Sequence, residues 1–220
     1  MDHYSTFAVH PETLLRFGEM TDRYTPWTRV GNIVSNGAFT LSEWSLNRRI
    51  IAEKSQHYWD RDTVSLNGVV FYPMENVVSE ERMFRVEQLH YTQVVPLDKI
   101  PLYRDMPDTP YVQSAYLGTY YYLINTKRPP VDDARVRKAL AMTVDREKLT
   151  RTVLQQTAFP AYSITPPDTL GYFPPKLFDY DPTEARRLLA EAGYPNGEGW
   201  PGLEILYNTN EGHRKIAVAI

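Results

Sequence analysis

Residues 114–126 read SAYLGTYYYLINT, and residues 132–156 read DDARVRKALAMTVDREKLTRTVLQQ. The first run is rich in Tyr, Thr, Leu and Ile, which favours a β-strand. It is roughly twice as long as a typical strand, so it is expected to leave one domain and enter another. We therefore place a domain boundary near Gly118. The second run has apolar residues at helical spacing and predicts helices after that boundary.

The predicted helices begin and end at residues that commonly cap helices. Asp133 and Asp145 stand at the starts of two successive helices, where an aspartate side chain accepts backbone N–H groups. Asp181 and Pro182 mark the start of another helix, and Gly193 marks its end.

Earlier in the chain, apolar and polar residues alternate on both sides of a short turn. This pattern predicts a hairpin with strands near 38–45 and 49–54, followed by a third strand at 69–72. A short helix is predicted with Ser79 as its N-cap, and another strand at 203–208. Strands and helices are intermixed without an internal repeat, which predicts an α/β or α+β protein with two lobes.

Composition excludes several kinds of site. The net charge is -3, which gives no general attraction to nucleic acid or anionic lipid. The chain has no cysteine, and its five histidines show no metal-ligand spacing such as HExxH. A GxSxG elbow and a phosphate-binding glycine loop are also absent. We therefore expect no catalytic residues, no metal, no cofactor and no enzymatic activity.

The two ends of the sequence carry separate signals. The first residues contain no uninterrupted apolar stretch of the kind that a signal peptide needs. An apolar helical pattern continues to Ile220 without a cap. We expect the natural polypeptide to be longer than this chain.

Six segments, read in order, resemble one family of proteins: VSNGAFTLSEW, YW, TYYYLINTKRPPVDDARVRKALAMTVDRE, AYSITPP, EARRLLAEAGYP and LEILYNT. Each segment could occur by chance, but the ordered set is similar to the family 5 extracellular solute-binding proteins. The similarity is greatest to their oligopeptide-binding branch, and it runs over nearly the whole chain.

The resemblance implies an α/β, two-lobed architecture of the type II periplasmic binding proteins, of which this chain is a part. Residues 1–117 would form the second segment of the first lobe, and residues 118–220 the first half of the second lobe. The implied function is extracytoplasmic or periplasmic capture of oligopeptides by a monomer that delivers them to an ABC permease in the membrane. The family's acidic anchor for the peptide amine would lie beyond this chain.

The resemblance also implies which residues meet the ligand. From the residues alone, the tyrosines near 120 are more typical of ordinary sheet or core packing than of a ligand wall. By resemblance, Tyr116 and Tyr121 border the peptide, Asn208 lines the pocket, and His213 helps to meet the peptide carboxylate. A tyrosine suits such a receptor because it combines an apolar face with a hydroxyl.

The sequence departs from the oligopeptide branch at two positions. Leu154 stands where a lysine often meets the peptide carboxylate, and Leu123 where an acidic residue is common. Two alternatives therefore stay open. The ligand could be another solute, such as a dipeptide, a metal chelate or a sugar, or the chain could be an interaction module without a transport role.

Overall fold

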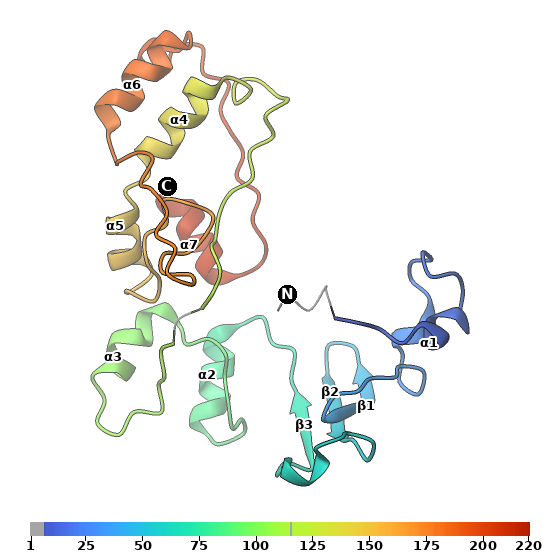
Figure 1. Cartoon of the computed structure of the whole chain (residues 1–220). Helices are drawn as coiled ribbons and strands as arrows, with labels where there is room; N and C mark the ends of the chain where they lie inside the picture. The colour runs from blue at the N-terminus through green and yellow to red at the C-terminus, as the bar shows by residue number, and fades with distance from the viewer. Residues whose placement is uncertain (1–6, 115) are drawn as a thin grey trace. The chain divides into compact units, whose positions relative to one another are not determined.

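The computed structural model describes residues 7–114 and 116–220 (Figure 1). The chain divides into two compact units, Met1–Met74 and Glu75–Ile220. This division follows the compactness of the backbone and falls at a different place from the lobe boundary expected near Gly118. The assignment of 1–117 and 118–220 to two lobes stays a prediction.

The first unit contains a small antiparallel sheet with three strands in the order β1-β2-β3. Its elements are α1 (Pro11–Leu15), η2 (Pro26–Thr28), β1 (Phe39–Ser45), β2 (Arg49–Lys54), η3 (Arg61–Thr63) and β3 (Gly68–Phe71). The hairpin and the third strand that the sequence predicts are confirmed.

The hairpin between β1 and β2 forms around a turn with Asn47 in the left-handed region, at a φ of 55°. Asparagine tolerates this conformation better than most residues do. Beside the turn, Arg49 on β2 makes a bidentate ion pair with Glu43 on β1, with Nη2 and Oε2 2.8 Å apart. The turn and the ion pair together fix the register of the two strands.

The second unit carries most of the helices. Its elements are α2 (Val77–Arg85), η4 (Leu97–Lys99), α3 (Ile100–Arg104), α4 (Ala134–Thr143), α5 (Arg146–Lys148), the π-turn η5 (Leu149–Val153), α6 (Pro182–Glu191), η6 (Pro195–Gly197) and α7 (Glu211–Ala219).

Most of the predicted helix starts are confirmed. The side chains of Asp133, Asp145 and Asp181 accept backbone N–H groups at the starts of α4, α5 and α6. The expectation for α2 was wrong by three positions, because Asn76 is its N-cap and accepts the backbone N–H of Ser79. Asparagine and serine cap helices about equally well, so local pattern alone did not distinguish them.

Helices α4 and α6 pack against each other around a small apolar core. Its buried members are Ala139 and Met142 from α4 with Ala185 and Leu188 from α6, and Phe178 and Leu189 pack at its edge. The two alanines are fully buried, which lets the helix backbones approach closely. This helix pair gives the second unit an apolar core of its own.

A buried carboxylate joins α2 to α3. The Glu81 side chain is only 4% exposed, and it accepts hydrogen bonds from Lys99 Nζ at 2.7 Å and Tyr103 Oη at 2.6 Å. Arg85 Nε lies 2.8 Å from the same carboxylate. Burial raises the pKa of Glu81, but the bonds from Lys99 and Tyr103 outweigh it and leave that pKa below its ordinary value. The ionised carboxylate therefore holds α3 against α2.

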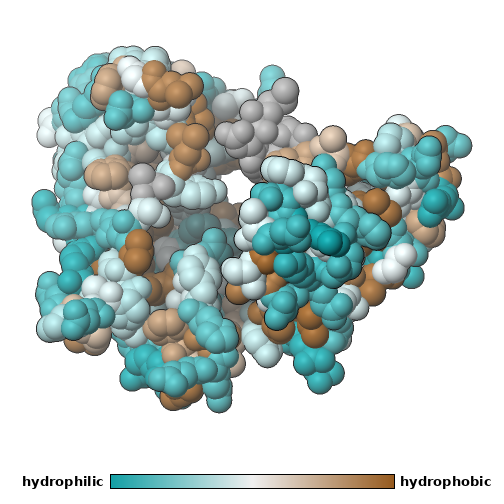
Figure 2. All heavy atoms as spheres, turned by 60° about the horizontal axis from the view of Figure 1, so that its bottom comes forward, coloured by the Kyte–Doolittle hydropathy of each residue, from teal (hydrophilic) through white to brown (hydrophobic). Residues whose placement is uncertain are grey.

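Two strands predicted in the second unit are not formed among the described residues. Residues 119–125 and 203–207 run as extended chain without a ladder of backbone hydrogen bonds. A strand is defined by its partner as well as by its residues, and neither segment pairs with another in this structure. Several of their apolar side chains are exposed, including Leu123 and Leu206. Figure 2 shows hydrophobic residues, in brown, between hydrophilic ones, in teal, on the face that it draws.

Candidate functional site

The structure brings together two of the four residues expected to bind ligand. Asn208 and His213 lie side by side, with the Oδ1 of Asn208 2.5 Å from the Nδ1 of His213. Tyr116 and Tyr121 are 89% and 54% exposed, and among the described residues neither makes a hydrogen bond or ring contact with this pair. Only the asparagine–histidine half of the expected site is therefore assembled within the described residues.

The start of α7 fixes the position of His213. Asn210 caps this helix by accepting the backbone N–H of His213 at 3.0 Å, which places the histidine in the first turn. An amide oxygen can only accept a hydrogen bond, so Nδ1 of the ring is the donor to Asn208. This contact orients the imidazole and leaves Nε2 as the ring atom that can meet a ligand.

Tyr120 stacks on the imidazole ring of His213. Its ring centroid lies 4.2 Å from that of His213, with an angle of 23° between the ring planes. Tyr122 meets Tyr120 edge-on, at 5.5 Å and 72°. Because alternate side chains of an extended segment share a face, Tyr120 and Tyr122 lie together, and Tyr121 is directed to the opposite face.

Sequence reasoning missed Tyr120. The alternation of the three tyrosines already placed Tyr120 with Tyr122, but it gave no sign of which face would meet His213. That information depends on a contact between residues 93 positions apart, which no local pattern encodes.

The Tyr122 hydroxyl is the polar end of the aromatic group. Its oxygen is buried and has no hydrogen-bond partner among the described residues. Burial raises the pKa of Tyr122, and the neighbouring Tyr120 and Tyr207 add to the effect. The phenol is therefore neutral, and it keeps an unused donor beside the histidine cluster.

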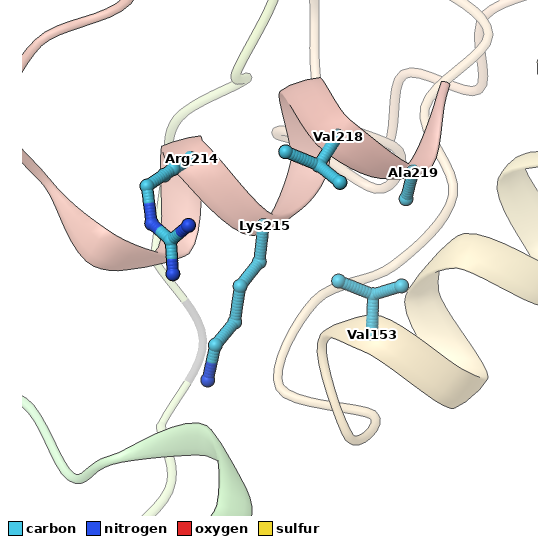
Figure 3. Close-up of a pocket in the computed structure, with 5 residues that line it drawn as sticks. All are labelled: Val153, Arg214, Lys215, Val218 and Ala219. Carbon is cyan, nitrogen blue, oxygen red and sulfur yellow. The ribbon is translucent and has the colours of Figure 1, made fainter.

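A shallow groove of about 270 Å³ lies between α7 and η5. Figure 3 shows Val153 facing the last turn of α7, with Arg214 and Lys215 on the preceding turn. Val218 and Ala219 complete the apolar part of the lining. Glu211 lies 3.2 Å from Arg214 Nη2 and 3.9 Å from Lys215 Nζ, so one carboxylate balances part of this charge.

The described residues contain no group of three or more His, Asp or Glu side chains arranged to hold a metal ion. None of the described helices has the length and apolar character needed to cross a membrane.

Comparison with known proteins identifies the family. Residues 3–220 match the family described as bacterial extracellular solute-binding proteins, family 5 Middle. The chain is 37% identical over 225 residues to the periplasmic oligopeptide-binding protein OppA of Escherichia coli, covering 99% of this chain and 40% of that protein. It thus spans about two fifths of the length of this relative.

Solved structures agree with the sequence match. The periplasmic oligopeptide-binding protein OppAIV of Borrelia burgdorferi matches with a TM-score of 0.85 and 31% identity, over 96% of this chain and 41% of that one. The murein tripeptide binding protein MppA of E. coli matches at 33% identity over 97% of this chain and 42% of its own, with a TM-score of 0.81. A second MppA structure, described as the unliganded open form, matches over 97% of this chain and 41% of its own, with a TM-score of 0.51.

These matches confirm the α/β fold class of the type II periplasmic binding proteins, of which the chain represents a part. They also confirm the family that the six sequence segments indicate. The chain belongs to family 5 of the bacterial extracellular solute-binding proteins.

Proposed function

We propose that this chain is part of the extracytoplasmic binding component of an ABC importer, and that the component captures oligopeptides. The observation that carries the proposal is the cluster of Tyr120, Asn208 and His213, in which stacking and a hydrogen bond orient one imidazole. Relatives described as oligopeptide-binding proteins support the choice of ligand.

The cluster suits a peptide end better than a sugar or a metal chelate. A peptide carboxylate needs a hydrogen-bond donor, and the Nε2 of His213 can supply one when the ring carries both protons. Tyrosine faces accept side chains of many types without demanding one shape. We assign Asn208 to orienting the histidine and His213 to the peptide carboxylate.

Tyr116 and Tyr121 belong to the proposed ligand wall as well, although they do not touch His213. Both rings are largely exposed, so each can receive a ligand without displacing packed protein. Tyr121 is directed away from the histidine face, which suits a peptide that passes across the extended segment. The predicted lobe boundary near Gly118 lies between these two tyrosines, and the role proposed for them depends on that boundary.

The proposal includes two lobes that close on the peptide about that boundary, followed by delivery to a membrane permease. It also includes a monomeric receptor with no catalytic step, cofactor or nucleic-acid partner. Membership of a solute-binding family supports the absence of catalysis, since such proteins release their ligand unchanged.

Calorimetry on the full-length natural protein that carries this chain tests the proposal. We expect tri- to pentapeptides to bind with a Kd of about 1 μM or tighter, equivalent to roughly -8 kcal/mol. Dipeptides, a metal chelate and a simple sugar serve as competing ligands. Tight binding of one of these without binding of longer peptides would replace the oligopeptide assignment, and binding of none would favour an interaction module.

A further inference from the structure

Two polar side chains near α3 reach the backbone that follows η5. Arg104 Nη2 donates to the carbonyl oxygen of Gln155 at 2.9 Å, and Gln113 Nε2 donates to the carbonyl oxygen of Gln156 at 3.0 Å. The partners are 51 and 43 residues apart in the chain. Two adjacent carbonyls are thus bound by two side chains from one distant segment.

The backbone at the accepting end has an unusual conformation. Gln155 and Gln156 both lie in the left-handed region, with φ values of 51° and 60°. This region is unfavourable for residues with a side chain, so two such residues in succession require support from their surroundings. The Gln156 N–H is bonded to the Thr150 carbonyl at 2.9 Å, which holds the turn against η5.

The donating end is also held in place. Tyr111 Oη donates to Gln113 Oε1 at 3.1 Å, and Arg104 Nη2 approaches the same oxygen at 3.4 Å. With its oxygen bound on this side, the amide of Gln113 presents its nitrogen to Gln156. Arg104 is the last residue of α3, which the buried Glu81 holds against α2.

These two bonds connect residues 75–114 to residues 116–220 within the second unit. Among the described residues, they are the only hydrogen bonds or ion pairs between 75–114 and 116–220. The segment between the two donors and the two acceptors includes Gly118, near which the sequence predicts the boundary of the lobes. Both bonds are exposed: the donors Arg104 and Gln113 are exposed residues, and of the acceptors Gln156 is exposed and Gln155 half-buried. The bonds can therefore break and form without opening a core.

We propose that Arg104, Gln113, Gln155 and Gln156 form a polar clasp that closes across the lobe boundary and prolongs the lifetime of the peptide-loaded receptor. The inference rests on the proposed function, because a loaded state requires a ligand. Two structures of the relative MppA match this chain with TM-scores of 0.81 and 0.51 over an equal share of it. The part of MppA that corresponds to this chain therefore has a different arrangement in the two structures.

The test compares a double variant, R104A/Q113A, with wild type in the full-length natural protein. A matched control, R82A/Q88A, removes the same two residue types from exposed positions on the same side of the boundary. Neither control side chain makes a hydrogen bond or ion pair among the described residues. Peptide dissociation is followed by stopped-flow fluorescence with a labelled tetrapeptide.

We expect the clasp variant to release peptide about three to ten times faster than the control, with the association rate unchanged. Both bonds are exposed, which is why the expected effect is below the full strength of two hydrogen bonds. Equal dissociation rates in the two variants, while wild type binds peptide, would overturn the clasp and leave the proposed function intact.

A second measurement does not require peptide. The chain has no cysteine, so spin labels can be attached through Asp98→Cys and Lys148→Cys, two exposed positions on opposite sides of the boundary. We expect R104A/Q113A to shift the distance distribution towards longer values and R82A/Q88A to leave it unchanged. If wild type binds no peptide, the proposed function fails, but the distance distribution still tests the clasp. A distribution that R104A/Q113A leaves unchanged would overturn the clasp.

Discussion

The α4–α6 helix pair and the cluster around His213 belong to the same unit but are held together in different ways. In the helix pair, Ala139 and Ala185 are fully buried, and apolar packing leaves little surface exposed. In the cluster, one hydrogen bond and two ring contacts orient side chains that stay partly exposed. The comparison indicates that the helix pair stabilises the fold, while the cluster leaves polar and aromatic surface exposed.

The largest expected effect concerns the core of the helix pair. Leu188 is 7% exposed within that core, so Leu188→Ala should lower the free energy of unfolding by about 2–4 kcal/mol. Urea unfolding followed by circular dichroism measures the change. Leu206→Ala is the matched control, because its side chain is 94% exposed and its loss should change stability by less than about 0.5 kcal/mol. Equal effects at both positions would show that burial in the α4–α6 core does not stabilise the fold.

A smaller effect is expected at the start of α6. Asp181 Oδ1 accepts the backbone N–H groups of Thr183 and Glu184 at 3.0 and 2.9 Å. Asp181→Ala should therefore lower the free energy of unfolding by about 1 kcal/mol, and Asp181→Asn should retain most of the stability because asparagine also caps helices. The same urea titration distinguishes the two variants. If they lose equal stability, the cap contributes through its charge and not through these bonds.

The smallest effect is a pH dependence at the start of α4. The Arg135 guanidinium, followed by the Arg135 backbone N–H, lowers the pKa of Asp133 from 3.8 to about 2. Since the pKa is lower in the folded chain, the ionised carboxylate contributes stability above about pH 4, and this contribution disappears as the pH falls through about 2. Asp133→Asn keeps a capping oxygen without the charge.

Unfolding measured between pH 5 and pH 2 should show a shallower loss of stability for Asp133→Asn than for wild type. The difference should be modest, because the Asp133 side chain is 31% exposed and water screens its ion pair. Identical slopes for the two proteins would show that the arginine contact does not stabilise the folded state.

The sequence predicts the two regions unequally. Asp133, Asp145 and Asp181 cap helices because capping is a local property of a few neighbouring residues. The hairpin is predictable for the same reason, since its two strands are joined by a short turn. For the extended segments at 119–125 and 203–207, residue composition favours strands, but a ladder depends on partners that local pattern does not specify.

The candidate site shows the same limit. Asn208 and His213 are near each other in sequence, and the structure places Asn208 Oδ1 2.5 Å from His213 Nδ1. Tyr120 joins them from a distant segment, so the period of two in the sequence could group it only with Tyr122. The involvement of Tyr116, Tyr121, Asn208 and His213 in ligand binding stays a prediction.

Peptide affinity and stability measured together for His213→Ala test the central claim most directly. In the full-length natural protein, we expect affinity for a tetrapeptide to fall about ten- to a hundredfold, because a charged hydrogen bond contributes roughly 1.5–3 kcal/mol. The free energy of unfolding should change by less than about 0.5 kcal/mol. His57→Ala, at an exposed histidine of the first unit, should change neither quantity. Equal affinity of His213→Ala and wild type, measured calorimetrically, would contradict the assignment of ligand binding to the cluster around His213.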